Sequence, residues 1–132
     1  MDEPGLLVVF GEPRSGRRAL AAAAASKDRL TVLAIAPRGE PHGGCAGYTG
    51  ALDEAIADAA RRDLDAAREI LAGRAGEASF VLLRTRCAAD VAEWAVRVGV
   101  RRAVVAARRG PRRSDATSRA LSRAGIAVSV AR

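Results

Sequence analysis

The fold of this chain is decided by Leu6-Leu-Val-Val-Phe10, followed by Gly11-Glu-Pro-Arg-Ser-Gly16-Arg-Arg18 and Ala19-Leu-Ala-Ala-Ala-Ala-Ala25. A short apolar run that ends in a turn is typical of a strand buried on both faces, as strands are in a parallel sheet. The turn contains two glycines and three arginines and leads into an alanine-rich helix. Because the N–H groups and dipole of a helix N-terminus attract anions, the segment also indicates a negatively charged ligand.

The composition is that of one domain spanning residues 1–132, with 49% hydrophobic residues to form a core. No apolar run approaches the roughly eighteen residues of a membrane span, and the acidic start Met1-Asp2-Glu3 does not resemble a signal peptide. Two cysteines do not make a disulfide framework. We therefore expect a cytoplasmic protein that does not associate with a membrane.

The formal charge of +7 raises the question of a nucleic-acid partner. Lys27 is the only lysine, however, so nearly all of the positive charge is arginine. Arginine and alanine in such excess are typical of GC-rich coding, and we expect no nucleic-acid partner.

Apolar runs at regular intervals predict five strands, at 6–10, 30–36, 79–84, 102–107 and 126–130. Helical patterns lie between them, at 17–25, 52–72, 88–98 and from Ser114 or Asp115 to about Gly125. This alternation predicts an α/β fold with a five-stranded parallel, doubly wound sheet and about four helices. The glycine- and proline-rich stretch 37–50 predicts a mobile surface loop.

The spacing from Gly11 to Gly16 is that of a phosphate-binding P-loop between a strand and a helix. That motif then requires Lys and Ser or Thr, whereas this chain has Arg17 and Arg18, and Pro13 removes a backbone donor. The strand ends offer no evident general base, nucleophile or metal-binding acid, so we expect no enzymatic activity. His42, Cys45 and Cys87 fall short of the four ligands of a structural zinc site, and we expect no metal.

Seven arginines follow the first and fourth predicted strands: Arg14, Arg17, Arg18, Arg108, Arg109, Arg112 and Arg113. Ligands of doubly wound sheets bind at the carboxyl ends of the strands, where the winding reverses. If the first and fourth strands are neighbours there, these side chains surround one crevice that suits a phosphate-bearing anion. The alternative is that several of them simply project into water.

The whole pattern resembles the universal stress protein family, whose architecture is of the adenine-nucleotide alpha-hydrolase-like type. The resemblance is carried by Ser15-Gly-Arg-Arg-Ala-Leu20, by Arg86-Cys-Ala-Ala-Asp-Val-Ala-Glu-Trp-Ala95 and by Ala103-Val-Val-Ala-Ala-Arg-Arg-Gly110. It implies a stress-response or regulatory protein and covers nearly the whole chain.

The resemblance also implies where a nucleotide such as ATP or AMP would bind, at Gly11, Arg17, Arg108, Gly110 and Ser114. Nucleotide-binding members carry Asp after the first strand, where this chain has Gly11. Their Gly-x-x-Gly loop is reduced here to Gly110, and Ser114-Asp115 stands where Gly-Ser would be, with a carboxylate that would repel phosphate. These departures resemble the members that do not bind ATP, so we expect a degenerate site and no cofactor.

The family usually dimerises by pairing its last strands, which implies a homodimer through Ile126–Val130. An unpaired edge strand is a liability that such a partner strand removes.

Overall fold

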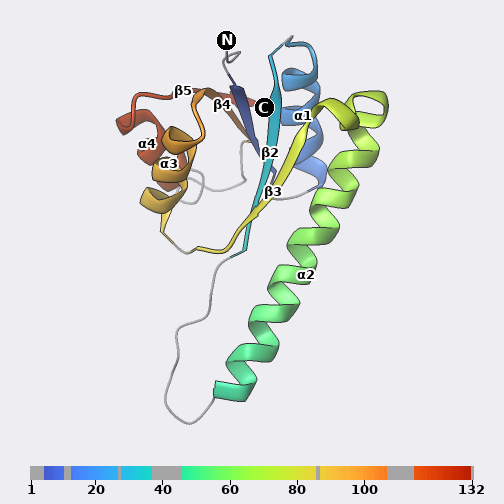
Figure 1. The fold of residues 1–132 in the computed structure, drawn as a ribbon, viewed down its shortest axis with the longest axis vertical. Helices are drawn as coiled ribbons and strands as arrows, with labels where there is room; N and C mark the ends of the chain where they lie inside the picture. The colour runs from blue at the N-terminus through green and yellow to red at the C-terminus, as the bar shows by residue number, and fades with distance from the viewer. Residues whose placement is uncertain are drawn as a thin grey trace.

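The computed structural model of the chain describes residues 5–10, 13–26, 28–36, 46–85, 87–106 and 115–131. The strands in it are β1 (Gly5–Val9), β2 (Leu30–Ile35), β3 (Ser79–Leu83), β4 (Val100–Ala106) and β5 (Ala127–Ala131). The helices are α1 (Pro13–Ala24), α2 (Ala46–Leu71), α3 (Ala88–Arg97) and α4 (Asp115–Arg123), with a 3₁₀ helix, η1 (Ala72–Glu77). Strands and helices alternate along the chain (Figure 1).

All five strands pair in parallel, in the order β3-β2-β1-β4-β5. The central strand is β1, in which Val8 pairs with Val32 on one side and with Val104 on the other. The chain therefore builds the sheet outward from β1 in one direction, through β2 to β3, and then returns to add β4 and β5. The predicted α/β class and doubly wound parallel sheet are confirmed.

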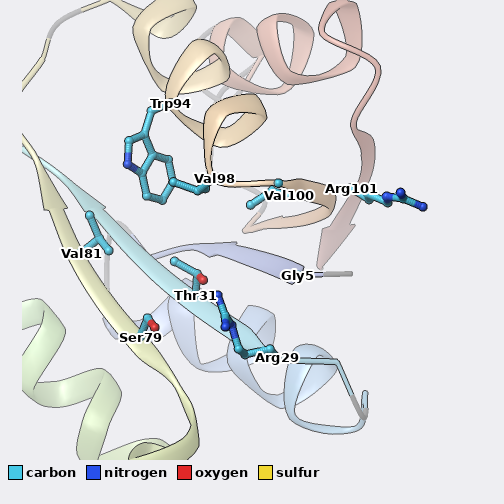
Figure 2. Close-up of a pocket in the computed structure, with 10 residues that line it drawn as sticks. Gly5, Arg29, Thr31, Ser79, Val81, Trp94, Val98, Val100 and Arg101 are labelled. Carbon is cyan, nitrogen blue, oxygen red and sulfur yellow. The ribbon is translucent and has the colours of Figure 1, made fainter. Parts of the chain in front are cut away.

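Helices α3 and α4 cover one face of the sheet, mainly over β1, β4 and β5 (Figure 1). Leu7, Leu33 and Leu121 are fully buried in this layer. Trp94 extends from α3 toward β2 and β3 (Figure 2), where it packs at the edge of the same cluster. The part of this face formed by β2 and β3 is thus covered less completely than the rest.

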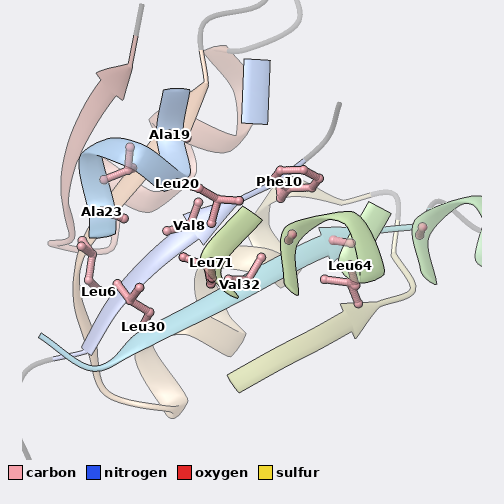
Figure 3. Close-up of a cluster of buried hydrophobic side chains, with 14 of the residues drawn as sticks. Leu6, Val8, Phe10, Ala19, Leu20, Ala23, Leu30, Val32, Leu64 and Leu71 are labelled. Atoms are coloured by element: carbon pink, nitrogen blue, oxygen red, sulfur yellow. The ribbon is translucent and has the colours of Figure 1, made fainter. Parts of the chain in front are cut away.

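Helices α1 and α2 cover the opposite face (Figure 3). Phe10 and Leu20 are fully buried there, and Leu64 and Leu71 bring α2 against the sheet. Many of the other contacts are made by alanines, whose small side chains let the helices approach the strands closely.

Helix α1 begins at Pro13, four residues before the predicted start at 17. Proline suits the first helical position, because its missing N–H would have no intrahelical acceptor there. The helix packs against the sheet on one side. Ala19, Leu20 and Ala23 are buried, whereas Arg17, Arg18 and the alanines on the outer side are exposed.

Helix α2 begins at Ala46, so 46–50 are helical rather than part of the predicted loop, and 37–45 lie outside the described residues. Leu52 is 48% exposed, because this end of the helix extends beyond the sheet (Figure 1). The helix ends at Leu71, and Ala72 has a positive φ of 50°. Gly73 is therefore one residue beyond the left-handed position.

Gly125 ends α4 with the left-handed φ of 87° that favours glycine. Its N–H donates to the carbonyl of Ser122 (3.0 Å), and the N–H of Ile126 donates to that of Leu121 (3.0 Å). This pair of hydrogen bonds is a Schellman motif, which turns the chain directly into β5.

Within the described ranges, no helix is both long enough and apolar enough to cross a membrane.

Candidate functional site at the carboxyl ends of the strands

The direction of winding reverses between β1 and β4, which are neighbours in the sheet. The adjacency that the arginine hypothesis required is therefore present. Helix α1, which comes after β1 in the chain, packs on one face of the sheet, and α4, which comes after β4, packs on the other. The carboxyl edge at such a reversal of winding is the usual ligand site of an open α/β sheet.

A cavity of about 330 Å³ lies at this edge of the sheet. Ile35 at the end of β2 and Thr85 just after β3 form its strand side. The remaining walls come from the first turns of two helices: Cys87, Ala88 and Val91 at α3, and Ala116 and Thr117 at α4. This volume is at the lower end of the range for small-ligand pockets.

Two helix N-termini therefore meet at the same cavity, that of α3 at Ala88 and that of α4 at Asp115. The first N–H groups of a helix have no intrahelical acceptor, and the helix dipole places partial positive charge there. An anion in the cavity would be stabilised by both helices.

The Thr85 hydroxyl holds the entry to α3 in place. Its Oγ1 donates a hydrogen bond to Oδ2 of Asp90 (2.7 Å) and accepts one from the N–H of Cys87 (3.1 Å). Thr85 is buried, so the loss of either interaction would leave a polar atom poorly solvated. The two hydrogen bonds of Thr85 hold the wall of the cavity in place. Among the described residues that line the cavity, the exposed free thiol of Cys87 and the hydroxyl of Thr117 are the other polar side-chain groups.

Arg84 is a positive charge at the end of β3 that is largely enclosed by the protein. Its Nη2 donates to the backbone carbonyl of Asp53 in α2 (3.1 Å), which ties the edge strand to the long helix. Its Nε is buried and has no hydrogen-bond partner among the residues that the structure describes.

Gly16 has a packing role that explains the P-loop-like spacing. It is buried, and a Cβ at this position would overlap Cε2 and Cδ2 of the Phe10 ring and lie 2.9 Å from Cζ. The first turn of α1 can therefore approach the end of β1 only because residue 16 is a glycine. This close approach accounts for Gly16 without any phosphate.

Of the predicted nucleotide-site residues, the structure describes Arg17 alone. It is exposed on α1 and does not line the cavity. The other four predicted positions lie outside the described residues: Gly11, Arg108, Gly110 and Ser114. Three more of the seven arginines also lie outside them: Arg109, Arg112 and Arg113. His42 and Cys45 also lie outside them, whereas Cys87 lines the cavity.

Sequence reasoning missed two polar residues that line the cavity, Thr85 and Thr117, and considered Cys87 only as a metal ligand. Thr85 and Cys87 directly follow the third strand, and Thr117 lies in the first turn of the last helix. A polar residue just after a predicted parallel strand is the signal that would have found Thr85, because all such positions lie at one edge of the sheet.

The sequence matches no protein-family model and no curated protein. Solved structures do share its architecture. A universal stress family protein from Burkholderia pseudomallei has 21% identity and a TM-score of 0.73, with 97% of this chain and 95% of that one covered. The universal stress protein UspA from Lactobacillus plantarum has 16% identity and a TM-score of 0.79, over 100% and 99% of the two chains.

The chain has the universal stress protein fold. A further universal stress protein structure, a complex with cAMP, has 16% identity and a TM-score of 0.56 over 98% and 97% of the two chains. The universal stress architecture implied by the sequence pattern is therefore confirmed along the length of the chain. The five strands and the four α-helices of the structure correspond to those that the sequence pattern predicted.

Proposed function

We propose that this chain is a universal-stress-like regulatory protein of the cytoplasm that acts by binding and not by catalysis. The proposal is supported by the fold and by Gly11, which stands where nucleotide-binding members of the family carry an Asp. The contact between Gly16 and Phe10 supports the proposal further, because packing explains the glycine that gives this turn the spacing of a P-loop. The ATP site of the family is thus incomplete in this chain.

Calorimetric titration with ATP and AMP tests the incomplete site. We expect no binding of ATP at micromolar concentration and no release of phosphate above that of a blank without protein. Micromolar binding of ATP would overturn the incomplete site, and phosphate release that survives repeated purification would overturn the non-enzymatic role.

The second candidate function is binding of a small phosphate-bearing anion at the crevice. The observation that favours it is the meeting of two helix N-termini, those of α3 and α4, at one cavity between β2 and the start of these helices. A solved structure with the same fold is a complex with cAMP, which makes a cyclic nucleotide a suitable probe of this chain.

Titration with cAMP at low and high salt distinguishes the two candidates. Binding at the crevice should weaken with salt, and also in Thr117→Tyr, which fills the cavity from α4. Arg17→Ala and Arg108→Ala should weaken it as well if these arginines reach the bound anion. Arg62→Ala, an exposed arginine on α2, is the matched control. The crevice has no such role if cAMP fails to bind, or binds Thr117→Tyr as well as the parent.

We also propose that the protein is a homodimer formed through β5. This strand pairs only with β4 among the described strands, so its outer edge has free hydrogen-bonding groups. Val130 on it is 52% exposed, one of the few large apolar side chains left on the surface. Antiparallel pairing with the same strand of a second copy would cover both features.

A further inference from the structure

A second and larger cavity, of about 510 Å³, lies at the opposite edge of the sheet. It is formed where β1 to β4 begin, so the whole length of the strands separates it from the crevice at their carboxyl ends. Open α/β sheets normally bind ligands at the carboxyl ends, and nothing in the sequence pattern pointed to this edge.

The cavity exists because α3 covers only part of its face of the sheet. The helix packs over β4, and its last turn carries Trp94 and then Val98 out over the uncovered starts of β2 and β3. Figure 2 shows Trp94 overhanging the space from the helix, with Val81 across from it on β3. Val98 is 49% exposed although it is apolar. One wall of the cavity is therefore an incompletely covered apolar surface.

The floor of the cavity is polar. Thr31 and Ser79 are partners in the parallel register of β2 and β3, so their side chains emerge side by side on the same face of the sheet. Their hydroxyls can both donate and accept hydrogen bonds. Neither hydroxyl has a hydrogen-bond partner among the residues that the structure describes.

The charged group of the cavity is Arg29, which immediately precedes β2. Its side chain is exposed, and it extends beside Thr31 toward the cavity (Figure 2). The guanidinium has no ion pair or hydrogen bond within the described part of the chain. The next nearest cation, Arg101, lines the rim but points away from the space (Figure 2). Arg102 is engaged elsewhere, in an ion pair with Asp28.

We propose that this cavity binds a small aromatic anion, with the flat ring against Trp94 and Val98 and the anionic group on Arg29. Each part of the site suits that chemistry. An indole offers an apolar surface on which a ring can stack, and the guanidinium fork matches a carboxylate or phosphate. Thr31 and Ser79 would hydrogen-bond to the polar edge of the ligand between these two ends. The volume is within the usual range for small-molecule sites.

The chain supplies a direct reporter, because Trp94 is the only tryptophan and so gives the only indole N–H signal in a ¹H–¹⁵N NMR spectrum. The probe is 2-naphthoate, and its neutral isostere 2-naphthamide isolates the contribution of charge. We expect 2-naphthoate to shift the signals of the Trp94 indole, Thr31 and Ser79 but not those of Cys87 and Thr117. The amide should bind more weakly by about tenfold, the usual order for loss of one charged hydrogen bond.

Two variants test the assignment. Arg29→Gln should weaken binding of the naphthoate to the level of the amide, and Ser79→Phe should weaken both by filling the floor. Both sites are exposed, so the fold should be kept, and the dispersion of the NMR spectrum verifies this. Arg62→Gln, on the outer face of α2, is the control. The proposal is overturned if 2-naphthoate causes no shifts at this edge, if its shifts map to Cys87 and Thr117, or if Arg29→Gln binds as tightly as the parent.

Discussion

Gly16 in the first turn of α1 lies directly against the aromatic ring of Phe10, the residue that follows β1. Phe10 has no exposed surface, so its ring cannot move out into solvent to make room for a larger neighbour. The contact sets how closely the first helix approaches the central strand, at the point where the winding of the sheet reverses. The two residues are six positions apart and are brought together by the turn between strand and helix.

Gly16→Ala should therefore destabilise the protein. The added methyl group must displace either the ring or the helix, and overpacking of this kind costs about 1–3 kcal/mol of unfolding free energy. Urea denaturation measures the loss. Gly76→Ala in η1 is the matched control, because a Cβ there meets no atom within 4 Å. The double variant Phe10→Leu/Gly16→Ala should be less destabilised than the sum of its single changes, and simple additivity would contradict the contact.

Ala72→Gly should stabilise the protein. Ala72 has a left-handed φ of 50° at the end of α2, a conformation that costs an L-residue about 1–2 kcal/mol. Glycine removes that cost but loses about 0.5–1 kcal/mol of backbone entropy, so the net gain in unfolding free energy should be up to about 1.5 kcal/mol. Thermal unfolding measures it as a higher Tm. Gly73→Ala is the control, because φ is not positive there and a Cβ meets no atom, so this change should not lower Tm. A lower Tm in both variants would mean that α2 does not end at Leu71 in solution.

Thr85→Val should destabilise the entry to α3. The change keeps the shape of the side chain but leaves the Cys87 N–H without its acceptor and Asp90 without its donor. Loss of a partly buried hydrogen bond of this type should cost about 0.5–1.5 kcal/mol of unfolding free energy. A double-mutant cycle with Asp90→Ala in urea denaturation isolates the bond between the two side chains. A coupling energy indistinguishable from zero would mean that the two side chains do not interact in solution.

Leu33→Ala and Leu52→Ala should have very different effects on stability. Leu33 is fully buried between the sheet and the α3–α4 layer, so its truncation should cost about 2–5 kcal/mol. Leu52 is 48% exposed at the projecting end of α2, and its truncation should stay within about 0.5 kcal/mol. The same urea titration compares the two. A large loss in Leu52→Ala would mean that another part of the protein, or a second copy, covers this end of the helix.

Val130→Lys should convert the proposed dimer into a monomer. Light scattering on a sizing column should give twice the chain mass of 13.7 kDa for the parent protein and the chain mass itself for the variant. A charge on an edge strand opposes pairing with another strand. Val96→Lys, at an equally exposed valine on α3, should remain a dimer. A parent protein that runs as a monomer, or a Val130→Lys variant that stays dimeric, would exclude this interface.

Local sequence pattern was enough to predict the five strands and four helices, because each depends on residues close together in the chain. The apolar run 6–10 could be recognised as a buried parallel strand before any partner was known. Helix ends were less predictable. The chain leaves α2 at Ala72 in a left-handed conformation that alanine disfavours, so the residue type there does not mark the end of the helix.

The sequence by itself thus determined the class of fold, its parallel sheet and its likeness to the universal stress proteins. Only the tertiary structure decided that Gly16 serves the packing of Phe10, and that Leu52 lies beyond the sheet. It also brought Arg29, Ser79 and Trp94 to one cavity, although they come from three separate parts of the chain. The physical reason is that strand formation depends on local patterns, whereas a cavity depends on which distant segments the crossover connections place side by side.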